Sequence, residues 1–183
     1  MKEDNNYQVT LQKPIHSGFG SQTTAREVLE GFDLNGKIVI VTGGYSGVGL
    51  ETTRALAEAG ATVIVPARTP EKALTSVAGI PRVELEELDL IKPASIEAFA
   101  QRFLDSGRQL DILINNAGIM APPLVRDARG YESQFATNHL GHFQLTLMLW
   151  PALKKAKNAR VVSVSSTGIR FGWLRFTDIC TKS

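Results

Sequence analysis

The stretch TGGYSGVGLETTRALAEAGA, residues 42–61, lies where a buried strand gives way to a helix. The residues before it, KIVIV at 37–41, form a short apolar, β-branched run that is typical of a strand buried on both faces. The residues that follow carry apolar side chains at helical spacing, and Gly60 can end that helix as a C-terminal cap. Three of the glycines at the junction between strand and helix stand at the spacing G-x-x-x-G-x-G: Gly43, Gly47 and Gly49.

This glycine turn predicts an anion site. A tight turn needs residues without a Cβ, and a ligand phosphate needs close access to backbone N–H groups. The first turn of the helix adds unpaired N–H groups and the positive end of the helix dipole. A plain glycine turn without a ligand is the alternative, but the T-G-x-x-x-G-x-G spacing between a strand and a helix favours a phosphate or pyrophosphate site.

Strand-like and helix-like segments alternate along the rest of the chain. Strands are predicted at 37–43, 61–67, 82–88, 110–118 and 159–166, and helices at 47–60, 71–78, 92–107 and 131–157. This alternation predicts an α/β fold with a parallel sheet and helices on both faces. The expected strand order is 3-2-1-4-5, that of a doubly wound, Rossmann-type sheet. Its ligand crevice should lie between strands 1 and 4, where the order reverses.

Composition limits the class of protein. Lys and Arg number 20 against 18 Asp and Glu, so nothing favours nucleic acid or an acidic membrane surface as a partner. Cys180 is the sole cysteine, which excludes an intrachain disulfide and suits a cytoplasmic location. The polar N-terminus and the lack of a long apolar run predict neither a signal peptide nor a membrane helix. We expect an N-terminal extension at 1–35, with a capping box at Thr24 and Glu27, followed by one domain at 36–183.

Five motifs resemble those of the short-chain dehydrogenase/reductase family in order and spacing. They are TGGYSGVG (42–49), DL (89–90), NNAG (115–118), TNHLGHF (137–143) and RVVSVSS (160–166). The resemblance covers about residues 34–166. The wording of NNAGIMAPP and ATNHLGHFQLT is most similar to the retinol-dehydrogenase-like and WW-domain-oxidoreductase-like branch.

The resemblance implies an NAD(P)-binding domain of an oxidoreductase that interconverts a small-molecule alcohol and a carbonyl by hydride transfer. The implied cofactor-binding residues are Gly43, Tyr45, Ser46, Gly47, Val48, Gly49, Arg68, Asp89, Leu90, Asn116, Ala117 and Gly118. Asp89 is expected to accept a hydrogen bond from the adenine amino group, with a role as a loop or helix-capping aspartate as the alternative. The amides of Asn115 and Asn116 can also tie the end of the fourth strand to its neighbours.

The end of the second strand predicts the choice of nicotinamide cofactor. An acidic residue there binds the ribose 2′-hydroxyl of NAD and repels the 2′-phosphate of NADP. Ala67 stands at this point and Arg68 follows, whose planar guanidinium can bind a phosphate through two donors. The sequence therefore predicts NADP(H) over NAD(H), against the alternative of a solvated arginine at a strand end.

The resemblance also implies a catalytic set. Ser166, with Ser165 as the alternative, would hydrogen-bond the reacting oxygen, and Asn138 would hold a water in the proton path. Hydride transfer leaves an alkoxide-like oxygen that needs a proton donor. The family uses a Tyr whose pKa is lowered by a Lys four residues later. The tyrosines of this sequence precede Ser166 and have no Lys at that spacing: Tyr7, Tyr45 and Tyr131.

We therefore expect the N-terminal part of a longer reductase, with a sheet incomplete on its C-terminal side and little turnover by itself. The fifth strand would be an apolar edge, and the helix at 139–156 would expose an apolar face, so the family's homo-oligomer is not expected of this chain. That face comprises Leu140, Phe143, Leu147 and Trp150. The alternative function is a non-catalytic dinucleotide-binding module or a truncated form that binds a partner protein.

Two further hypotheses find little support in the sequence. A methyltransferase on a similar sheet is disfavoured by the glycine spacing and by Arg68. A metal site at His139 and His142 is not expected, because no Cys or acidic residue accompanies them at ligand spacing.

Overall fold

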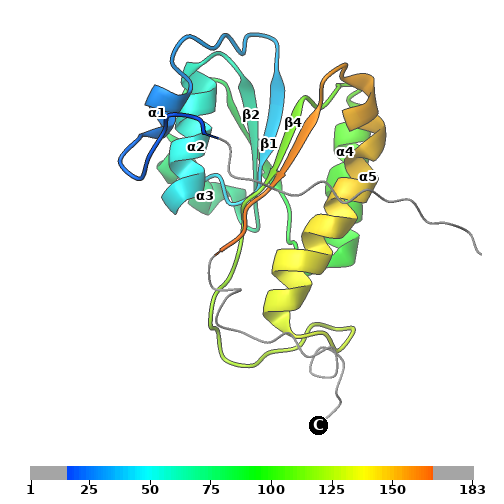
Figure 1. The fold of residues 1–183 in the computed structure, drawn as a ribbon. Coiled ribbons are helices and arrows are strands. Elements are labelled where there is room, and N and C mark those ends of the chain that lie inside the picture. The colour runs from blue at the N-terminus through cyan, green and yellow to red at the C-terminus, as the bar shows by residue number, and fades with distance from the viewer. Residues whose placement is uncertain (1–15, 167–183) are drawn as a thin grey trace, which may run out of the picture.

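A five-stranded parallel sheet forms the centre of the computed structural model, which describes residues 16–166 (Figure 1). Its strands are β1 (Ile38–Val41), β2 (Thr62–Ala67), β3 (Val83–Glu87), β4 (Ile112–Asn115) and β5 (Arg160–Ser163). They lie in the order β3-β2-β1-β4-β5, and each neighbouring pair is parallel. The predicted Rossmann-type strand order is thus confirmed, with the glutamate-rich β3 at one edge.

The helices begin and end at the signals that the sequence provides. They are α1 (Ala25–Val28), α2 (Gly47–Glu58), α3 (Pro70–Val77), α4 (Pro93–Asp105) and α5 (His142–Lys155), preceded by the π-helical segment η1 (Phe135–Gly141). Thr69 is the N-cap residue of α3 and Pro70 its first residue. Gly60 follows α2 with φ of 105°, a conformation that glycine adopts without strain. Thr24 and Glu27 form the predicted capping box.

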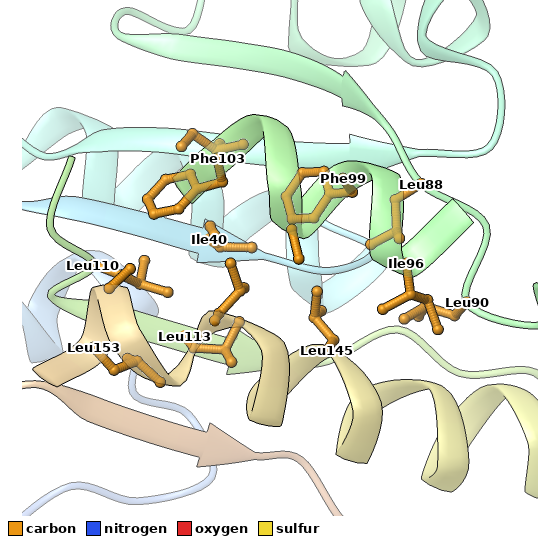
Figure 2. Packing of buried hydrophobic residues seen from close by; sticks show 14 residues of the cluster. Ile40, Leu88, Leu90, Ile96, Phe99, Phe103, Leu110, Leu113, Leu145 and Leu153 are labelled. Carbon is orange, nitrogen blue, oxygen red and sulfur yellow. The ribbon is translucent and has the colours of Figure 1, made fainter. Parts of the chain in front are cut away.

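Both faces of the sheet are covered, α2 and α3 lying on one and α4 and α5 on the other (Figure 1). Successive side chains of a strand point to opposite faces, so Val39 and Val41 pack with α2 and α3 whereas Ile40 packs with α4 and α5. Figure 2 shows the second cluster, where Phe99 of α4 and Leu145 of α5 lie in the same layer as Ile40. Burial on both faces explains why the central strands β1 and β2 are nearly continuous apolar runs.

The predicted helix at 131–157 is not continuous, because it opens with the π-helical turn of η1. In an α-helix the Asn138 carbonyl would accept the backbone N–H of His142. Here that N–H donates to the His139 carbonyl, and the Asn138 carbonyl lies 2.9 Å from Nδ1 of the His142 side chain. Gly141 ends the segment where a Cβ would collide with the Leu90 backbone carbonyl. A tertiary contact therefore sets the irregular turn.

The surfaces at the two ends of the described chain agree with the expectations in part, since β5 and three residues of the predicted apolar face are exposed but Leu140 is only partly exposed. In the N-terminal extension, Arg26 of α1 forms an ion pair with Glu58 of α2, the two atoms lying 2.8 Å apart. At the other end, β5 is an exposed edge strand, and α5 presents Phe143, Leu147 and Trp150 to solvent. Within residues 16–166, none of the helices combines the length and the apolar character needed to cross a membrane.

Asp111 joins β1 to β4 at the end of the sheet opposite the glycine turn. Its buried carboxylate accepts hydrogen bonds from the Ile38 backbone N–H at 3.0 Å, from Lys37 Nζ at 2.9 Å and from the Gln109 amide at 3.3 Å. Burial acts to raise the pKa of Asp111, but these hydrogen bonds and the Lys37 charge outweigh it and hold the pKa below its ordinary value.

Replacing this carboxylate should destabilise the fold in a pH-dependent way. Asp111→Asn removes the charge that these donors require, and we expect it to lower the free energy of unfolding at pH 7 by about 1–3 kcal/mol. Because the folded pKa is depressed, the stabilisation is present above the unfolded pKa of about 4 and is lost as pH falls through the folded value. Urea denaturation of both proteins at pH 7 and at pH 3 measures this difference.

Glu51→Gln, which changes an exposed carboxylate 3.7 Å from Arg54, is the matched control. It should change the stability by less than about 1 kcal/mol at either pH. A destabilisation by Asp111→Asn that is equal at pH 7 and pH 3 would contradict the assigned role of the charge.

Candidate functional site

A cavity of about 400 Å³ opens at the carboxyl ends of the strands, where the strand order reverses between β1 and β4. Such a crevice is where doubly wound sheets bind their ligands. With the exception of Gly47, the predicted cofactor-binding residues line it: Gly43, Tyr45, Ser46, Val48, Gly49, Arg68, Asp89, Leu90, Asn116, Ala117 and Gly118. The structure thus gathers residues from four separate segments into one place, and their contact with a cofactor stays a prediction.

The glycine turn is packed directly against the end of β4. Gly43 has φ of 66°, and a Cβ there would lie 3.0 Å from the Ala117 Cα. A Cβ on Gly49 would collide with the Gly43 carbonyl and with the side-chain amide of Asn116. Access for a phosphate is therefore not the sole reason for these glycines, because packing between the turn and the end of β4 requires two of them.

The first turn of α2 has backbone donors that its own N-cap residue does not satisfy. Ser46 is the N-cap residue, yet its side chain makes no capping hydrogen bond. Ser46, Gly47 and Val48 are exposed beside the cavity. Free N–H groups and the positive end of the helix dipole make this turn a favourable place for an anion.

Thr42 holds the glycine turn and the end of β4 together. Its Oγ1 accepts the backbone N–H groups of Asn116 at 2.9 Å and Ala117 at 3.0 Å, and its carbonyl accepts the Asn116 side chain at 2.9 Å. Asn115 extends the junction, donating to Thr146 Oγ1 of α5 at 3.1 Å. The predicted structural role of both asparagine amides is therefore confirmed, and Thr42 is a contributor that the sequence argument did not single out.

Asp89 lies at the cavity and also shapes its own loop. The carboxylate accepts the Ile91 backbone N–H at 3.3 Å and pairs with Lys92 at 3.2 Å, while the Asp89 backbone N–H donates to Ser95 Oγ at 2.9 Å. The loop-aspartate alternative is thus present in the structure, and the position at the cavity is compatible with the predicted adenine contact as well.

Arg68 stands at the cavity as an exposed cation without a partner among residues 16–166. Ala67 before it is buried, with 3% of its surface accessible. Arg102 and Arg108 pair with glutamates of β3, whereas Arg68 makes no hydrogen bond or ion pair with another residue of the described range 16–166. Its guanidinium can therefore meet an anionic group of a ligand without breaking an existing contact.

A second cavity, of about 640 Å³, lies on the other side of the Asn116–Gly118 backbone and brings the predicted catalytic residues together. Asn138, Ser165 and Ser166 all line it. The Asn138 side chain is engaged, since Oδ1 accepts the Ile119 N–H and Nδ2 donates to the Ile119 carbonyl, each at 2.9 Å. Proximity to a shared cavity is what the structure provides for the catalytic roles, which stay predictions.

His142 is buried beside the second cavity and contacts Thr42 at the end of β1. Burial lowers the pKa of His142, the neighbouring His139 lowers it further, and the hydrogen bond to the Asn138 carbonyl opposes both. The His142 Nε2 lies 2.9 Å from Thr42 Oγ1, so each ring nitrogen has a partner within the protein. His139 instead stacks on Phe135, with ring centroids 5.2 Å apart. In the described part of the chain, no group of three or more candidate metal ligands is present.

Several functional features lay beyond the sequence argument. Thr42 and Gly141 act through contacts with segments distant in sequence, and His142 was weighed only as a metal ligand. The cavity walls also include residues that were given no role from the sequence: Pro66, Leu88, Ile91, Ile119 and Thr137. For Thr42 a signal existed, because it opens the T-G-x-x-x-G-x-G motif.

Comparisons with known proteins agree with this geometry. The family model described as short chain dehydrogenase matches residues 37–177. Retinol dehydrogenase 12 from Bos taurus is 43% identical over 152 residues, covering 80% of this chain and 48% of that protein. A probable oxidoreductase from Streptomyces antibioticus is 50% identical over 141 residues, covering 73% of this chain and 46% of that protein. The chain spans about half the length of these curated relatives.

Solved structures show the same likeness. A crystal structure of a protein from Mycobacterium paratuberculosis superposes with a TM-score of 0.69 at 42% identity, covering 79% of this chain and 50% of that chain. The Pseudomonas aeruginosa RhlG/NADP active-site complex gives a TM-score of 0.60 at 33% identity, covering 71% of this chain and 54% of that chain. The motifs, the strand order and these matches place the chain in the short-chain dehydrogenase family, in its retinol-dehydrogenase-like branch.

Proposed function

We propose that this chain is the NADP(H)-binding part of a short-chain oxidoreductase that interconverts an alcohol and a carbonyl by hydride transfer. One observation carries the proposal: a glycine turn too tight for a Cβ, an arginine without a partner in the described part of the chain, and the end of β4 surround one cavity at the switch point of the sheet. Related structures support it, because the Pseudomonas aeruginosa, metagenomic and Escherichia coli proteins were solved with NADP or NADPH.

The residues present suit each part of the cofactor. The first turn of α2 at 46–49 would receive the pyrophosphate, and Arg68 the 2′-phosphate. Asp89 and Leu90 would border the adenine, while Asn116–Gly118 would border the ribose on the nicotinamide side. Tyr45 and Val48 would complete the walls.

The chemistry would take place on the far side of Asn116–Gly118. The bound nicotinamide supplies or accepts the hydride. Ser166, with Ser165 as the alternative, would hydrogen-bond the reacting oxygen from the end of β5, and Asn138 would hold a water in the proton path.

A non-catalytic binding role is the second candidate, and one observation favours it. The sequence holds no Tyr followed four residues later by Lys, so the general acid has no occupant among these residues. We propose that the 183-residue chain binds NADPH but turns it over little. An NADPH oxidation assay with a panel of aldehydes and ketones tests this, and robust turnover would contradict it.

Since one relative is a chloroplastic protein of Brassica napus, a cytoplasmic location stays a prediction.

The cofactor preference should depend on the end of β2. The wild-type chain should bind NADPH at least about tenfold more tightly than NADH, because Arg68 gains a charge-assisted contact with the 2′-phosphate. The double change Ala67→Asp and Arg68→Ala should reverse the preference, since a carboxylate repels the phosphate and binds a 2′-hydroxyl. Calorimetric titration with both cofactors measures the ratio.

Arg108→Ala is the matched control, because Arg108 already pairs with Glu84 away from the cavity. It should leave the NADPH to NADH ratio unchanged. If the double change at 67 and 68 also leaves that ratio unchanged, the 2′-phosphate does not bind at Arg68.

The close contact at Gly49 should be required for any dinucleotide. In Gly49→Ala the added methyl would overlap the Gly43 carbonyl and the Asn116 side chain, so the turn would have to change its conformation. We expect the affinities for NADPH and NADH to fall together by about tenfold or more. Gly20→Ala, whose Cβ would meet no atom within 4 Å, should change neither affinity. Equal binding by the two variants would show that the turn does not form the site.

A further inference from the structure

Four polar groups lie within hydrogen-bonding distance of the Thr42 hydroxyl, which can donate one hydrogen bond and accept two. This limit fixes the direction of each hydrogen bond. The backbone N–H groups of Asn116 and Ala117 can only donate, and they fill the acceptor positions of Oγ1. The hydroxyl proton then has two candidates, the Ile114 carbonyl at 3.3 Å and His142 Nε2 at 2.9 Å. The Ile114 carbonyl already accepts the Thr42 backbone N–H at 3.1 Å, and its contact with Oγ1 is the longer one. The proton therefore goes to His142.

The second ring nitrogen of His142 settles its tautomer. Nδ1 lies 2.9 Å from the Asn138 carbonyl, which can only accept, so Nδ1 carries a hydrogen. Nε2 must be bare in order to accept from Thr42. His142 is thus a neutral imidazole with its hydrogen on Nδ1, buried so that 6% of its surface is accessible. A proton on Nε2 would leave Thr42 Oγ1 facing three donors.

The backbone carbonyl of His142 is hydrogen-bonded as well as its ring. Thr146 Oγ1 donates to the His142 carbonyl at 2.8 Å and accepts from Asn115 Nδ2 at 3.1 Å. These bonds tie the first turn of α5 to the end of β4, and the imidazole ties the same turn to β1. The chain of hydrogen bonds runs from the Asn138 carbonyl through His142 and Thr42 to the backbone at 116–117.

We propose that His142 is a positioning residue. It fixes where the Asn116–Gly118 backbone, the wall shared by the two cavities, lies relative to Asn138. It acts through Thr42, to which its Nε2 is hydrogen-bonded. The inference rests on the proposed function, in which this wall borders the nicotinamide half of the cofactor. The adenine half, at Arg68 and Asp89, lies at the ends of other strands and does not depend on His142.

Three substitutions of His142 separate its two hydrogen bonds. His142→Leu removes both and should weaken NADPH binding about tenfold. His142→Gln can place an amide oxygen near the Nε2 position and so keep the bond from Thr42, which should restore most of the affinity. His142→Asn can keep only the donor to the Asn138 carbonyl and should restore less. Adenosine 2′,5′-bisphosphate, which carries the adenine half alone, should bind all four proteins within about twofold.

The outcomes distinguish the inference from the function on which it rests. A folded His142→Leu protein that binds NADPH like the wild type, or that loses NADPH and the bisphosphate equally, overturns the inference alone. A wild-type chain that binds neither molecule overturns the proposed function and the inference with it.

The wild-type protein provides an independent test should His142→Leu fail to fold. Long-range ¹H–¹⁵N NMR correlations of the imidazole report its tautomer directly. At pH 7 we expect the pattern of a neutral ring with its hydrogen on Nδ1. A hydrogen on Nε2, or a doubly protonated ring, overturns the inference.

Discussion

The close approach of the β1–α2 turn to the end of β4 is the contact on which the rest of the structure depends. Gly43 and Gly49 leave no space for a Cβ between the two segments, and Thr42 hydrogen-bonds the opposing backbone. The cavity is the space that remains beside this junction, so the first turn of α2 and the backbone at 116–118 are fixed by one arrangement. Residues that satisfy packing thereby also form the walls of the site.

The two ends of the sheet differ in how their polar groups are satisfied. At the amino ends of β1 and β4, the Asp111 carboxylate is saturated with donors and contributes to stability. At the carboxyl ends, polar groups stay available: the first turn of α2 has no side-chain cap, and Arg68 has no partner among the described residues. These groups are exposed, so water can satisfy them, and a ligand could take the place of that water at little cost to the fold.

Local patterns predicted the fold well, because strand runs, caps and glycine turns are encoded by neighbouring residues. The strand order and the boundaries of α3 follow from such signals. The break at η1 does not, since it depends on the His142 side chain taking the place of a backbone N–H and on Gly141 meeting Leu90. The strand order located the crevice at the switch point, and the motifs supplied residues that line both cavities. That the Asn138 amide holds Ile119 is revealed only by the tertiary structure.

The most direct test of the central claim, that the switch-point cavity binds NADP(H), is a titration of ¹⁵N-labelled chain with NADPH followed by amide NMR. The largest shift changes should fall on four separate segments, 43–49, 68, 89–90 and 116–118, while α1 and the outer end of α2 near Glu58 stay unchanged. Shift changes that are absent, or that centre on the groove between α1 and α2, would contradict it.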